Sequence, residues 1–311
     1  MARNLMLIVN PRSGRGLSKS AVGTIVSQLC LGGYIVTVYY TNSEENPETL
    51  AFDYAKHHDL AVCVGGDGTL SSVISGLISA NVSIPVGFIP SGTSNDVATT
   101  LALSRNPAEA VKTILNGKPH PIDVGIFSGR YFTYIAAFGA FTGVSYRTPQ
   151  SAKRALGHFA YVLGGLADVF TIKARRTIVE HDDGIIEGDF IFGAVLNSTS
   201  VAGLVKLDPR RVNLADGLFE IILVKQPIAL PRLIDTLTSI MTQNYDGDNV
   251  LMLHSSKARF SFLEEVAWTI DGENGGNHTE VEIDNCHEAI SIILYPETRE
   301  YLQYYFHGIE E

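Results

Sequence analysis

Three glycine-rich loops of the sequence carry residue types that suit phosphate chemistry. The first loop is NPRSGRG (10–16), the second loop is VGGDGTL (64–70) and the third loop is PSGTSND (90–96). Backbone N–H groups, helix N-termini and a few cations make phosphate sites, and glycine lets the backbone approach a ligand closely. Asp67 stands out, because a carboxylate beside phosphate is unfavourable unless a Mg²⁺ ion or a transferable proton lies between them. A tight turn capped by Asp67 is the structural alternative.

The loops do not match the two commonest nucleotide-binding motifs. The P-loop pattern GxxxxGK[ST] occurs nowhere in the sequence. A dinucleotide fingerprint would follow Gly14 and Gly16 with a third glycine, but that position is Lys19. The sequence therefore excludes these two nucleotide folds.

The elements that must position the loops alternate between short apolar runs and helical patterns. This alternation predicts a parallel or mostly parallel sheet covered by helices. Ligands bind such sheets at the carboxyl ends of the strands, which is where the three loops and the polar segment YYTN (39–42) fall. The predicted strands are 4–10, 34–40, 60–66 and 84–90, and the predicted helices are 17–33, 47–58 and 71–80.

After about residue 121 the pattern changes to strands with partial period-two alternation, for which an antiparallel β-sandwich is the simplest structure. Helices are predicted at 149–170 and 231–243. The fold class is therefore α/β + all-β, with an α/β domain at 1–121 and a β-sandwich domain at 122–295. The tail at 296–311 is expected to return to the first domain. The predicted strands are 188–198, 217–225, 257–263, 279–284 and 289–295.

The motifs in this order resemble a known family. NPRSGRG, GGDGTL and PSGTSNDVA are similar to the catalytic domain of the diacylglycerol kinase and sphingosine kinase superfamily. PIDVG, ALGHFAYVLGGL, RRVNLADGLFEI and WTIDGENGG resemble landmarks of the soluble bacterial diacylglycerol kinases, over nearly the whole chain. GGDGT also occurs in NAD kinases and phosphofructokinases, whereas its combination with LADGLFE and DGE is highly specific. The resemblance implies an active site in the cleft between two domains and ATP-dependent phosphorylation of a lipid hydroxyl.

The resemblance also implies roles for single residues. Asp67 would hold or orient a catalytic Mg²⁺, Glu273 would take the proton from the lipid hydroxyl, and Asp123 would support a network of water and metal between the domains. A second, structural Mg²⁺ would bind the Asp216 carboxylate and the backbone carbonyls of Asn213 and Leu218, because Mg²⁺ prefers oxygen ligands. The ATP site would comprise Asn10, Pro11, Arg12, Ser13, Gly14, Thr41, Gly65, Gly66, Asp67, Gly68, Thr69, Leu70, Ser71 and Thr93.

The sequence departs from the family pattern after GGDGTL. The family usually continues Asn-Glu-Val, whereas this chain has Ser71, Ser72 and Val73. The missing acidic side chain could weaken a contact to the metal or nucleotide, or alter the nucleotide preference. Asp67 and Glu273 are unaffected, so we expect an active enzyme.

The sequence does not identify the lipid that accepts the phosphate. Diacylglycerol, giving phosphatidate, is the simplest acceptor, and another lipid alcohol such as an undecaprenol or a sphingoid base is the enzymatic alternative. NAD kinase is disfavoured because the remaining landmarks match the lipid kinases. A regulator that binds lipid or nucleotide without turnover is the non-enzymatic alternative, favoured by Ser72 and opposed by the retained carboxylates.

A basic segment offers a way to meet a membrane. Arg147, Lys153, Arg154, Lys173, Arg175 and Arg176 surround a single acid, Asp168. An anionic lipid surface would attract such a cluster by about 1 kcal/mol per basic residue. The alternatives are a packed helix with solvated basic ends, or Lys153 and Arg154 neutralising the triphosphate.

Composition sets the remaining expectations. A hydrophobic fraction of 45% and a charged fraction of 18% describe an ordinary globular protein, and a net charge of −10 disfavours nucleic acid as a partner. Three scattered cysteines make no CxxC pair, and no signal peptide or membrane-spanning run is apparent. We expect a cytoplasmic protein in reversible peripheral contact with the inner face of the membrane. Exposed sheet edges would permit a homodimer.

Overall fold

The computed structural model describes residues 3–14, 17–139, 173–201, 205–208, 212–226 and 249–295. The helices predicted at 149–170 and 231–243 and the tail at 296–311 lie outside these ranges. So do three members of the basic segment, Arg147, Lys153 and Arg154.

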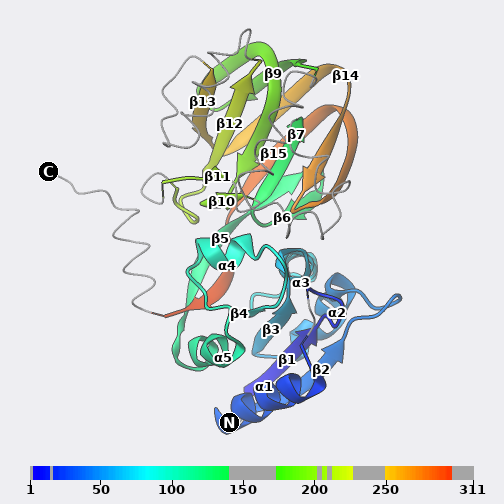
Figure 1. Cartoon of the computed structure of the whole chain (residues 1–311), viewed down its shortest axis with the longest axis vertical. Helices are drawn as coiled ribbons and strands as arrows, with labels where there is room; N and C mark the ends of the chain where they lie inside the picture. The colour runs from blue at the N-terminus through cyan, green and yellow to red at the C-terminus, as the bar shows by residue number, and fades with distance from the viewer. Residues whose placement is uncertain are drawn as a thin grey trace, which may run out of the picture.

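The N-terminal part of the chain builds a parallel sheet with helices packed around it (Figure 1). Strands β4, β3, β1 and β2 lie side by side in this order, and each neighbouring pair is parallel. The elements are β1 Arg3–Val9, α1 Lys19–Leu31, β2 Tyr34–Tyr40, α2 Pro47–Tyr54, the 3₁₀ turn η1 Ala55–His57, β3 Leu60–Gly65, α3 Asp67–Ser79, β4 Val86–Pro90, α4 Asp96–Thr100 and α5 Pro107–Asn116.

Local sequence explains why these elements begin where they do. β3 and β4 are buried along their whole length, which accounts for their uninterrupted apolar sequence. The side chains of Ser18, Asn46 and Asn106 accept hydrogen bonds from the first-turn backbone N–H groups of α1, α2 and α5. Proline occupies the first position of α2 and α5, where its missing N–H costs nothing.

Helix α3 begins four residues earlier than predicted, at Asp67 instead of residue 71. Its buried apolar side chains start with Leu70, so the first turn, Asp67 to Thr69, carries no apolar periodicity for a sequence pattern to detect. Gly66 is the extended N-cap residue. Half of the second loop is therefore the first turn of a helix.

The C-terminal part is antiparallel, as predicted for this half of the chain. Along the sheet the order is β13-β12-β9-β7-β14-β15, with β8 paired to β14 and β9, and β5 paired to β15 and β6. The strands are β5 Lys118–Phe127, β6 Arg130–Phe132, β7 Ile135–Gly139, β8 Arg175–His181, β9 Gly184–Leu196, β10 Ser200–Val201, β11 Val205–Lys206, β12 Phe219–Lys225, β13 Val250–Ser255, β14 Lys257–Ile270 and β15 Glu273–Leu294.

The strands predicted separately at 279–284 and 289–295 are parts of one strand, β15, which is 22 residues long. Its pairing with β5 shifts register between Cys286 and Ile290. This irregularity interrupts the alternation of apolar and polar residues, which explains why the sequence pattern appears as two strands.

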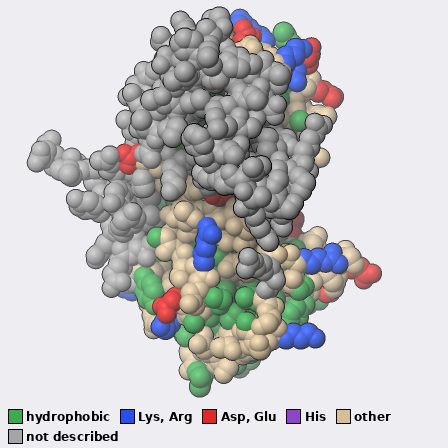
Figure 2. Space-filling view, in the orientation of Figure 1, with side chains coloured by type: hydrophobic (Ala, Val, Ile, Leu, Met, Phe, Trp, Pro, Cys, Tyr) green, Lys and Arg blue, Asp and Glu red, His purple; other side chains and the backbone are tan. Residues whose placement is uncertain are grey.

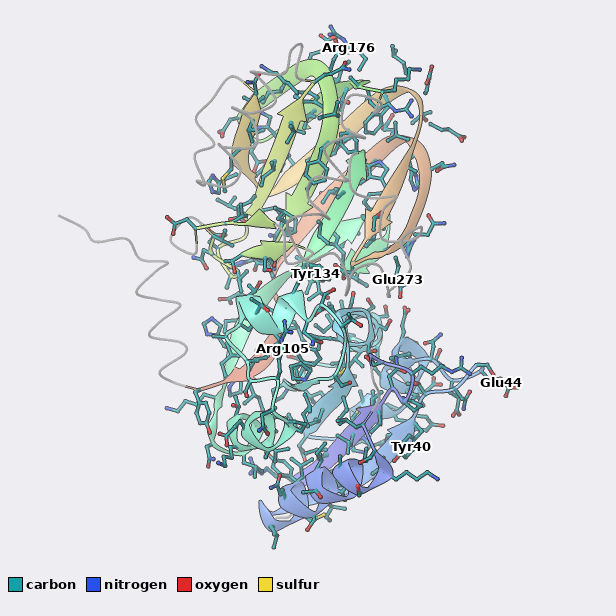
Figure 3. The ribbon with its side chains drawn as sticks, in the orientation of Figure 1. Tyr40, Glu44, Arg105, Tyr134, Arg176 and Glu273 are labelled. Carbon is teal, nitrogen blue, oxygen red and sulfur yellow. The ribbon has the colours of Figure 1, made fainter. Side chains whose placement is uncertain are left out.

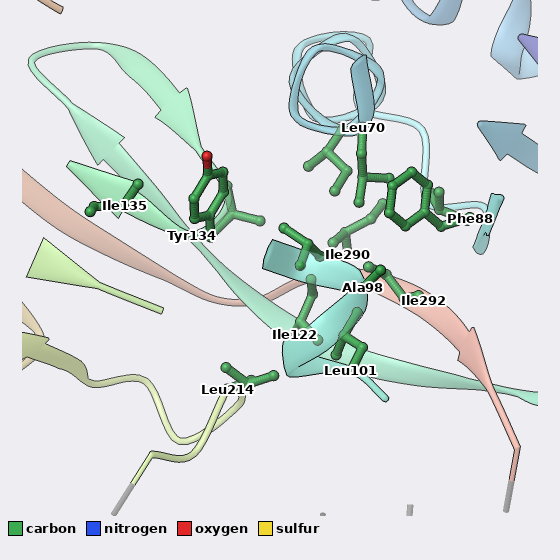
Figure 4. Packing of buried hydrophobic residues seen from close by; sticks show 14 of the residues in the cluster. Leu70, Phe88, Ala98, Leu101, Ile122, Tyr134, Ile135, Leu214, Ile290 and Ile292 are labelled. Atoms are coloured by element: carbon green, nitrogen blue, oxygen red, sulfur yellow. The ribbon is translucent and has the colours of Figure 1, made fainter. Parts of the chain in front are cut away.

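Two strands connect the two parts of the molecule. Ile292 of β15 pairs in parallel with Val86 of β4, so one hydrogen-bonded sheet continues from the C-terminal part into the N-terminal part. Ile292 also lies in one hydrophobic cluster with Phe88 and Ile122 (Figure 4). The predicted domain boundary after residue 121 falls inside β5, which runs through this junction.

The described members of the basic segment lie among acidic side chains. Lys173 and Arg175 both pair with Glu264, at 3.0 and 3.1 Å, and Arg176 pairs with Glu187 at 2.9 Å. Figure 3 places Arg176 at the end of the molecule farthest from α1, and Figure 2 shows basic and acidic side chains mixed there. Within the described ranges, no helix combines the length and the apolar character needed to cross a bilayer.

Candidate active site

The three glycine-rich loops meet at the carboxyl ends of the parallel strands. A side chain at Gly14 would place its Cβ 2.1 Å from the carbonyl oxygen of Ser91, and a Cβ at Gly92 would lie 2.6 Å from Cα of Gly66. Such separations are too short for any side chain, so the backbones of the loops touch. Gly14 also has a φ of +58°, which favours glycine.

Side-chain hydrogen bonds fix the first loop against the second. Asn10 donates from Nδ2 to Oγ1 of Thr69 at 2.9 Å, and its Oδ1 accepts from the backbone N–H of Arg12 at 3.0 Å. Its own backbone N–H donates to the carbonyl oxygen of Val64. Asn10 thereby joins the end of β1 to the first turn of α3.

Asp67 connects the second loop to the third. One carboxylate oxygen accepts from the backbone N–H of Asp96 at 2.9 Å, and the other accepts from that of Val97 at 3.2 Å. Asp67 is therefore a capping group, as in the structural alternative, but it caps the neighbouring helix α4 instead of its own turn. Because a carboxylate has about four acceptor sites, two remain for another partner.

Burial makes the charge of Asp67 costly. The side chain is 8% exposed. Burial raises the pKa of its carboxyl from 3.8 to about 6, although the backbone N–H of Asp96 lowers it. The negative charges of Asp96 and Asp271 raise it further. A positive charge beside Asp67 would relieve this cost.

The loops form one wall of a cavity of about 400 Å³, and the C-terminal part forms the opposite wall. That second wall comprises Tyr134, Asp271, Gly272 and Glu273. Figure 3 shows Tyr134 and Glu273 at the junction between the two parts of the molecule. A second cavity, of about 190 Å³, shares Gly68, Ser72, Asp271 and Glu273 with the first.

Glu273 faces the second loop across this cavity. Its Oε1 lies 3.4 Å from the point where a Cβ of Gly68 would stand. Gly68 is the neighbour of Asp67, so residues 206 positions apart in the sequence lie on opposite walls of one site. The cavity is lined by nine of the predicted residues: Asn10, Ser13, Gly14, Gly66, Asp67, Gly68, Thr69, Thr93 and Glu273.

The other predicted ATP-site residues have different surroundings. The Leu70 side chain is fully buried in the core, and its backbone N–H donates to Gly66. Thr41, the residue after β2, donates its backbone N–H to the carbonyl oxygen of Val9, the last residue of β1. Pro11, Arg12 and Gly65 line neither cavity, and Ser71 lines only the second.

Asp271 is a site residue that the sequence reasoning missed. Its buried carboxylate accepts hydrogen bonds from the hydroxyl of Ser71 and from the backbone N–H groups of Thr133, Tyr134 and Ile135. Burial raises the pKa of the Asp271 carboxyl, and these hydrogen bonds oppose the rise.

Asp96, at the end of the third loop, lines neither cavity but donates its backbone N–H to Asp67, a contact that the sequence reasoning also missed. It is 3% exposed, and its carboxylate accepts from the hydroxyl of Ser200 at 2.9 Å. Its position after a glycine-rich loop and at the start of a helix was a usable signal, because that is where the sequence had already placed a phosphate site.

Asp123 lies apart from the cavity, in a second polar centre. Its side chain is fully buried. One carboxylate oxygen accepts from the backbone N–H of Gly217 and from Asn285, and the other accepts from His287 and from the backbone N–H of Glu288. All four acceptor sites are thus used. Asp123 holds the 213–218 loop in place without a free lone pair for a metal.

The predicted structural metal site adjoins Asp123. Asp216 accepts from the backbone N–H of Leu218, and Asn213 accepts from that of Ala215. Burial raises the pKa of Asp216, and the charge of Asp123 raises it further. Glu220 is buried nearby with an unpaired Oε2, and burial holds the pKa of its carboxyl well above the usual range. A bound cation would offset the clustered negative charge of Asp123, Asp216 and Glu220.

Metal-binding geometry from side chains alone is absent in the ranges that the structure describes. No group of three or more His, Cys, Asp or Glu side chains there could hold a metal ion. A Mg²⁺ ion commonly uses one or two carboxylates together with water, backbone carbonyls or phosphate oxygens. Asp67 and the 213–218 loop fit this second pattern.

The fold and the site define a class of protein. A parallel sheet with phosphate-type loops faces an antiparallel part across a cavity with carboxylates on both walls, an arrangement suited to phosphoryl transfer. The family model of the diacylglycerol kinase catalytic domain matches residues 4–127.

Curated relatives extend this match over most of the chain. A diacylglycerol kinase of Staphylococcus saprophyticus is 31% identical over 282 residues, covering 89% of this chain and 90% of that protein. One of Bacillus subtilis is 28% identical over 298 residues, covering 95% and 98%. The chain therefore belongs to the diacylglycerol kinase family, whose members are phosphotransferases acting on an alcohol group.

A solved structure shows the same fold. The crystal structure of a diacylglycerol kinase from Bacillus anthracis superposes with a TM-score of 0.76 at 22% sequence identity. The match covers 95% of this chain and 98% of that chain. The likeness therefore concerns the whole described architecture and not the N-terminal part alone.

Proposed function

We propose that this chain transfers the γ-phosphate of ATP to the free hydroxyl of diacylglycerol and releases phosphatidate and ADP. Its family membership supports an ATP-dependent lipid kinase. The observation that carries the proposal is the shared cavity, in which Asp67 and Glu273 come from opposite walls. Phosphoryl transfer needs a positioned nucleotide, neutralisation of phosphate charge and a base for the incoming hydroxyl, and this cavity offers a group for each task.

The nucleotide belongs on the wall made by the loops. The first N–H groups of α3 have no intrahelical acceptors, and Gly68 and Thr69 at this end of the helix line the cavity. A helix N-terminus favours bound phosphate. Asp67 would hold Mg²⁺ with its two free acceptor sites, and the ion would supply charge neutralisation for the phosphates when bound.

Glu273 would act on the acceptor. It is an exposed side chain at the start of β15, and its carboxylate can accept the proton of a hydroxyl that enters between it and the phosphates. We assign ATP binding to the domain at 1–121 and lipid binding to the domain at 122–295.

A second Mg²⁺ would have a structural role at the 213–218 loop. Its ligands would be the Asp216 carboxylate and the backbone carbonyls of Asn213 and Leu218. Asp123 would act indirectly, because its four hydrogen bonds join Gly217, within the loop, to a segment of β15. The raised pKa of Asp216 supports this assignment, since a nearby cation would offset the clustered negative charge.

Contact with a membrane follows from a membrane-resident acceptor, and we propose that it is reversible. The described members of the basic segment contribute little to it, because Lys173, Arg175 and Arg176 lie beside carboxylates that offset their charge. The attraction to anionic lipid would therefore have to come from other parts of the surface.

The replacement Glu273→Gln tests the function. We expect the turnover of diacylglycerol in mixed micelles to fall by about 10²-fold or more, with unchanged affinity for ATP, because an amide cannot accept the proton. Glu280→Gln is the matched control, since Glu280 is an exposed glutamate of the same strand that pairs with Arg259. A Glu273→Gln protein that keeps more than half its activity would remove Glu273 from this role.

Assaying the protein with a panel of lipid alcohols identifies the acceptor. Phosphorylation of diacylglycerol above the other lipids supports the proposal, and phosphorylation of an undecaprenol or a sphingoid base in its place would reassign the substrate. ATP binding without turnover of any lipid would indicate the regulator.

A further inference from the structure

Glu273 follows a two-residue hairpin turn. Ile270 of β14 pairs with Glu273 of β15, so Asp271 and Gly272 form the whole connection. Their φ angles are +48° and +79°, as a type I′ turn requires, and Asp-Gly is a preferred sequence for it. The backbone position of Glu273 is therefore fixed by the geometry of this turn.

The turn itself is anchored by the Asp271 carboxylate. Three of its hydrogen bonds come from the consecutive backbone N–H groups of Thr133, Tyr134 and Ile135, at 2.7, 3.0 and 3.1 Å. The backbone N–H of Asp271 returns a fourth bond to the carbonyl of Ile135 at 2.9 Å. These contacts hold the turn against the segment between β6 and β7.

Ser71 adds the contact to the other wall. Its hydroxyl donates to the same carboxylate oxygen of Asp271 that accepts from Thr133. Ser71 lies one helical turn after Asp67 on α3, and both side chains are 8% exposed. Asp67 and Ser71 thus share the first turns of α3, Ser71 is hydrogen-bonded to Asp271, and Asp271 is two residues before Glu273 in the chain.

We propose that Asp271 is a positioning residue for Glu273, and that the Ser71–Asp271 hydrogen bond sets the separation between Glu273 and the nucleotide wall of the cavity. This inference rests on the proposed function. It also gives a role to Ser71, one of the two positions at which the chain departs from the usual family sequence. The Ser71 hydroxyl is held by a carboxylate of the opposite wall, so its task is to join the walls and not to contact ATP.

The physical reason is the sensitivity of phosphoryl transfer to position. A displacement of about 1 Å of a reacting group can reduce turnover by about 10²-fold. Asp271 has no free acceptor site, because four donors already use its lone pairs. Removing one donor loosens the link between the walls while leaving the turn anchored to the Thr133–Ile135 segment.

Ser71→Ala is the test, with Thr113→Val as the control for loss of a buried helix hydroxyl. Thr113 lies on α5, is 6% exposed, lines neither cavity and makes none of the four hydrogen bonds to Asp271. We expect Ser71→Ala to lower kcat for diacylglycerol by about tenfold, with KM for ATP changed by less than about twofold. Thr113→Val should keep the wild-type kcat. Equal kcat values for Ser71→Ala and wild type would overturn the inference.

Combining Ser71→Ala with Glu273→Gln separates positioning from simple loss of stability. If Ser71 acts through Glu273, the double variant is no slower than Glu273→Gln alone. A further tenfold loss in the double variant would refute positioning. Ser71→Thr, which retains the hydroxyl, should recover most of kcat, and failure to do so while the protein remains folded counts against the hydrogen bond.

The same variants distinguish a failure of the proposed function from a failure of the positioning inference. An active Glu273→Gln protein would overturn the proposed role of Glu273, and the inference with it, whereas a wild-type protein that phosphorylates no lipid would overturn the proposed function. An inactive Glu273→Gln protein together with a fully active Ser71→Ala protein would overturn the inference alone. Asp271→Asn complements these variants because an amide cannot accept from all four donors, and we expect it to lose more kcat than Ser71→Ala.

Discussion

Asp67 carries a charge that the protein without ligand must accommodate in a buried position. Its pKa is raised from 3.8 to about 6, first by burial and then by the neighbouring carboxylates. The folded protein therefore binds this proton more tightly than the unfolded chain does. The resulting contribution to stability is fully present below about pH 3.8 and is lost as the pH rises through about 6.

Asp67→Asn removes this titration and makes the cost measurable. A rise from 3.8 to about 6 corresponds to at most about 3 kcal/mol, at 1.36 kcal/mol for each pKa unit. The asparagine keeps one oxygen to accept from Asp96 or Val97, so the loss of the other hydrogen bond adds an offset that does not vary with pH. Relative to wild type, the variant should gain stability by up to this amount between about pH 4 and about pH 8.

Urea unfolding in the presence of a chelator is the measurement, carried out on both proteins at several pH values across this range. Asp53→Asn, a change at an exposed aspartate of α2, controls for the loss of one surface charge. Adding Mg²⁺ and ATP should reduce the pH dependence of the difference, because the cation compensates the Asp67 carboxylate. A difference between Asp67→Asn and wild type that is the same at every pH would refute the reasoning.

Three further replacements test other parts of the structure. Gly14→Ala should weaken Mg²⁺–ATP binding by about tenfold, measured by calorimetry, because its Cβ would meet the Ser91 carbonyl at 2.1 Å; unchanged affinity would exclude the loop contact from the nucleotide site. Asp123→Asn should lower the free energy of unfolding by about 2–4 kcal/mol in urea, since an amide leaves buried donors unpaired, and a loss below about 0.5 kcal/mol would contradict this. Asp216→Ala should abolish any rise in Tm on adding Mg²⁺, and a rise equal to that of wild type would move the structural ion elsewhere.

Local patterns predicted the N-terminal elements well. The strand predicted at 34–40 has these bounds in the structure, and the strand predicted at 60–66 ends one residue earlier. Buried parallel strands need continuous apolar sequence, and such runs are unambiguous when glycine-rich loops follow them. The convergence of the loops could be foreseen because parallel strands present their carboxyl ends at one edge.

The sequence patterns could not predict contacts between residues that are far apart in the chain. The DGE motif drew attention to Glu273, whereas Asp271 has the more extensive hydrogen bonding. The Asp-Gly pair between two apolar strands was a signal for a hairpin turn. It could not show that the aspartate would be buried against a helix 200 residues earlier, because that depends on how the two parts of the molecule pack.

The charges around the cavity explain why nucleotide and metal should bind as a pair. Asp67, Asp271 and Glu273 line the cavity, and none of its lining residues within the described ranges is a lysine or arginine. The donors that hold Asp67 and Asp271 are backbone N–H groups and a serine hydroxyl, which satisfy the oxygens without cancelling their charge. The phosphates of ATP would add further negative charge to this wall. A divalent cation that entered with the nucleotide would offset both, so the carboxylate whose charge destabilises the free protein would become a ligand in the proposed complex.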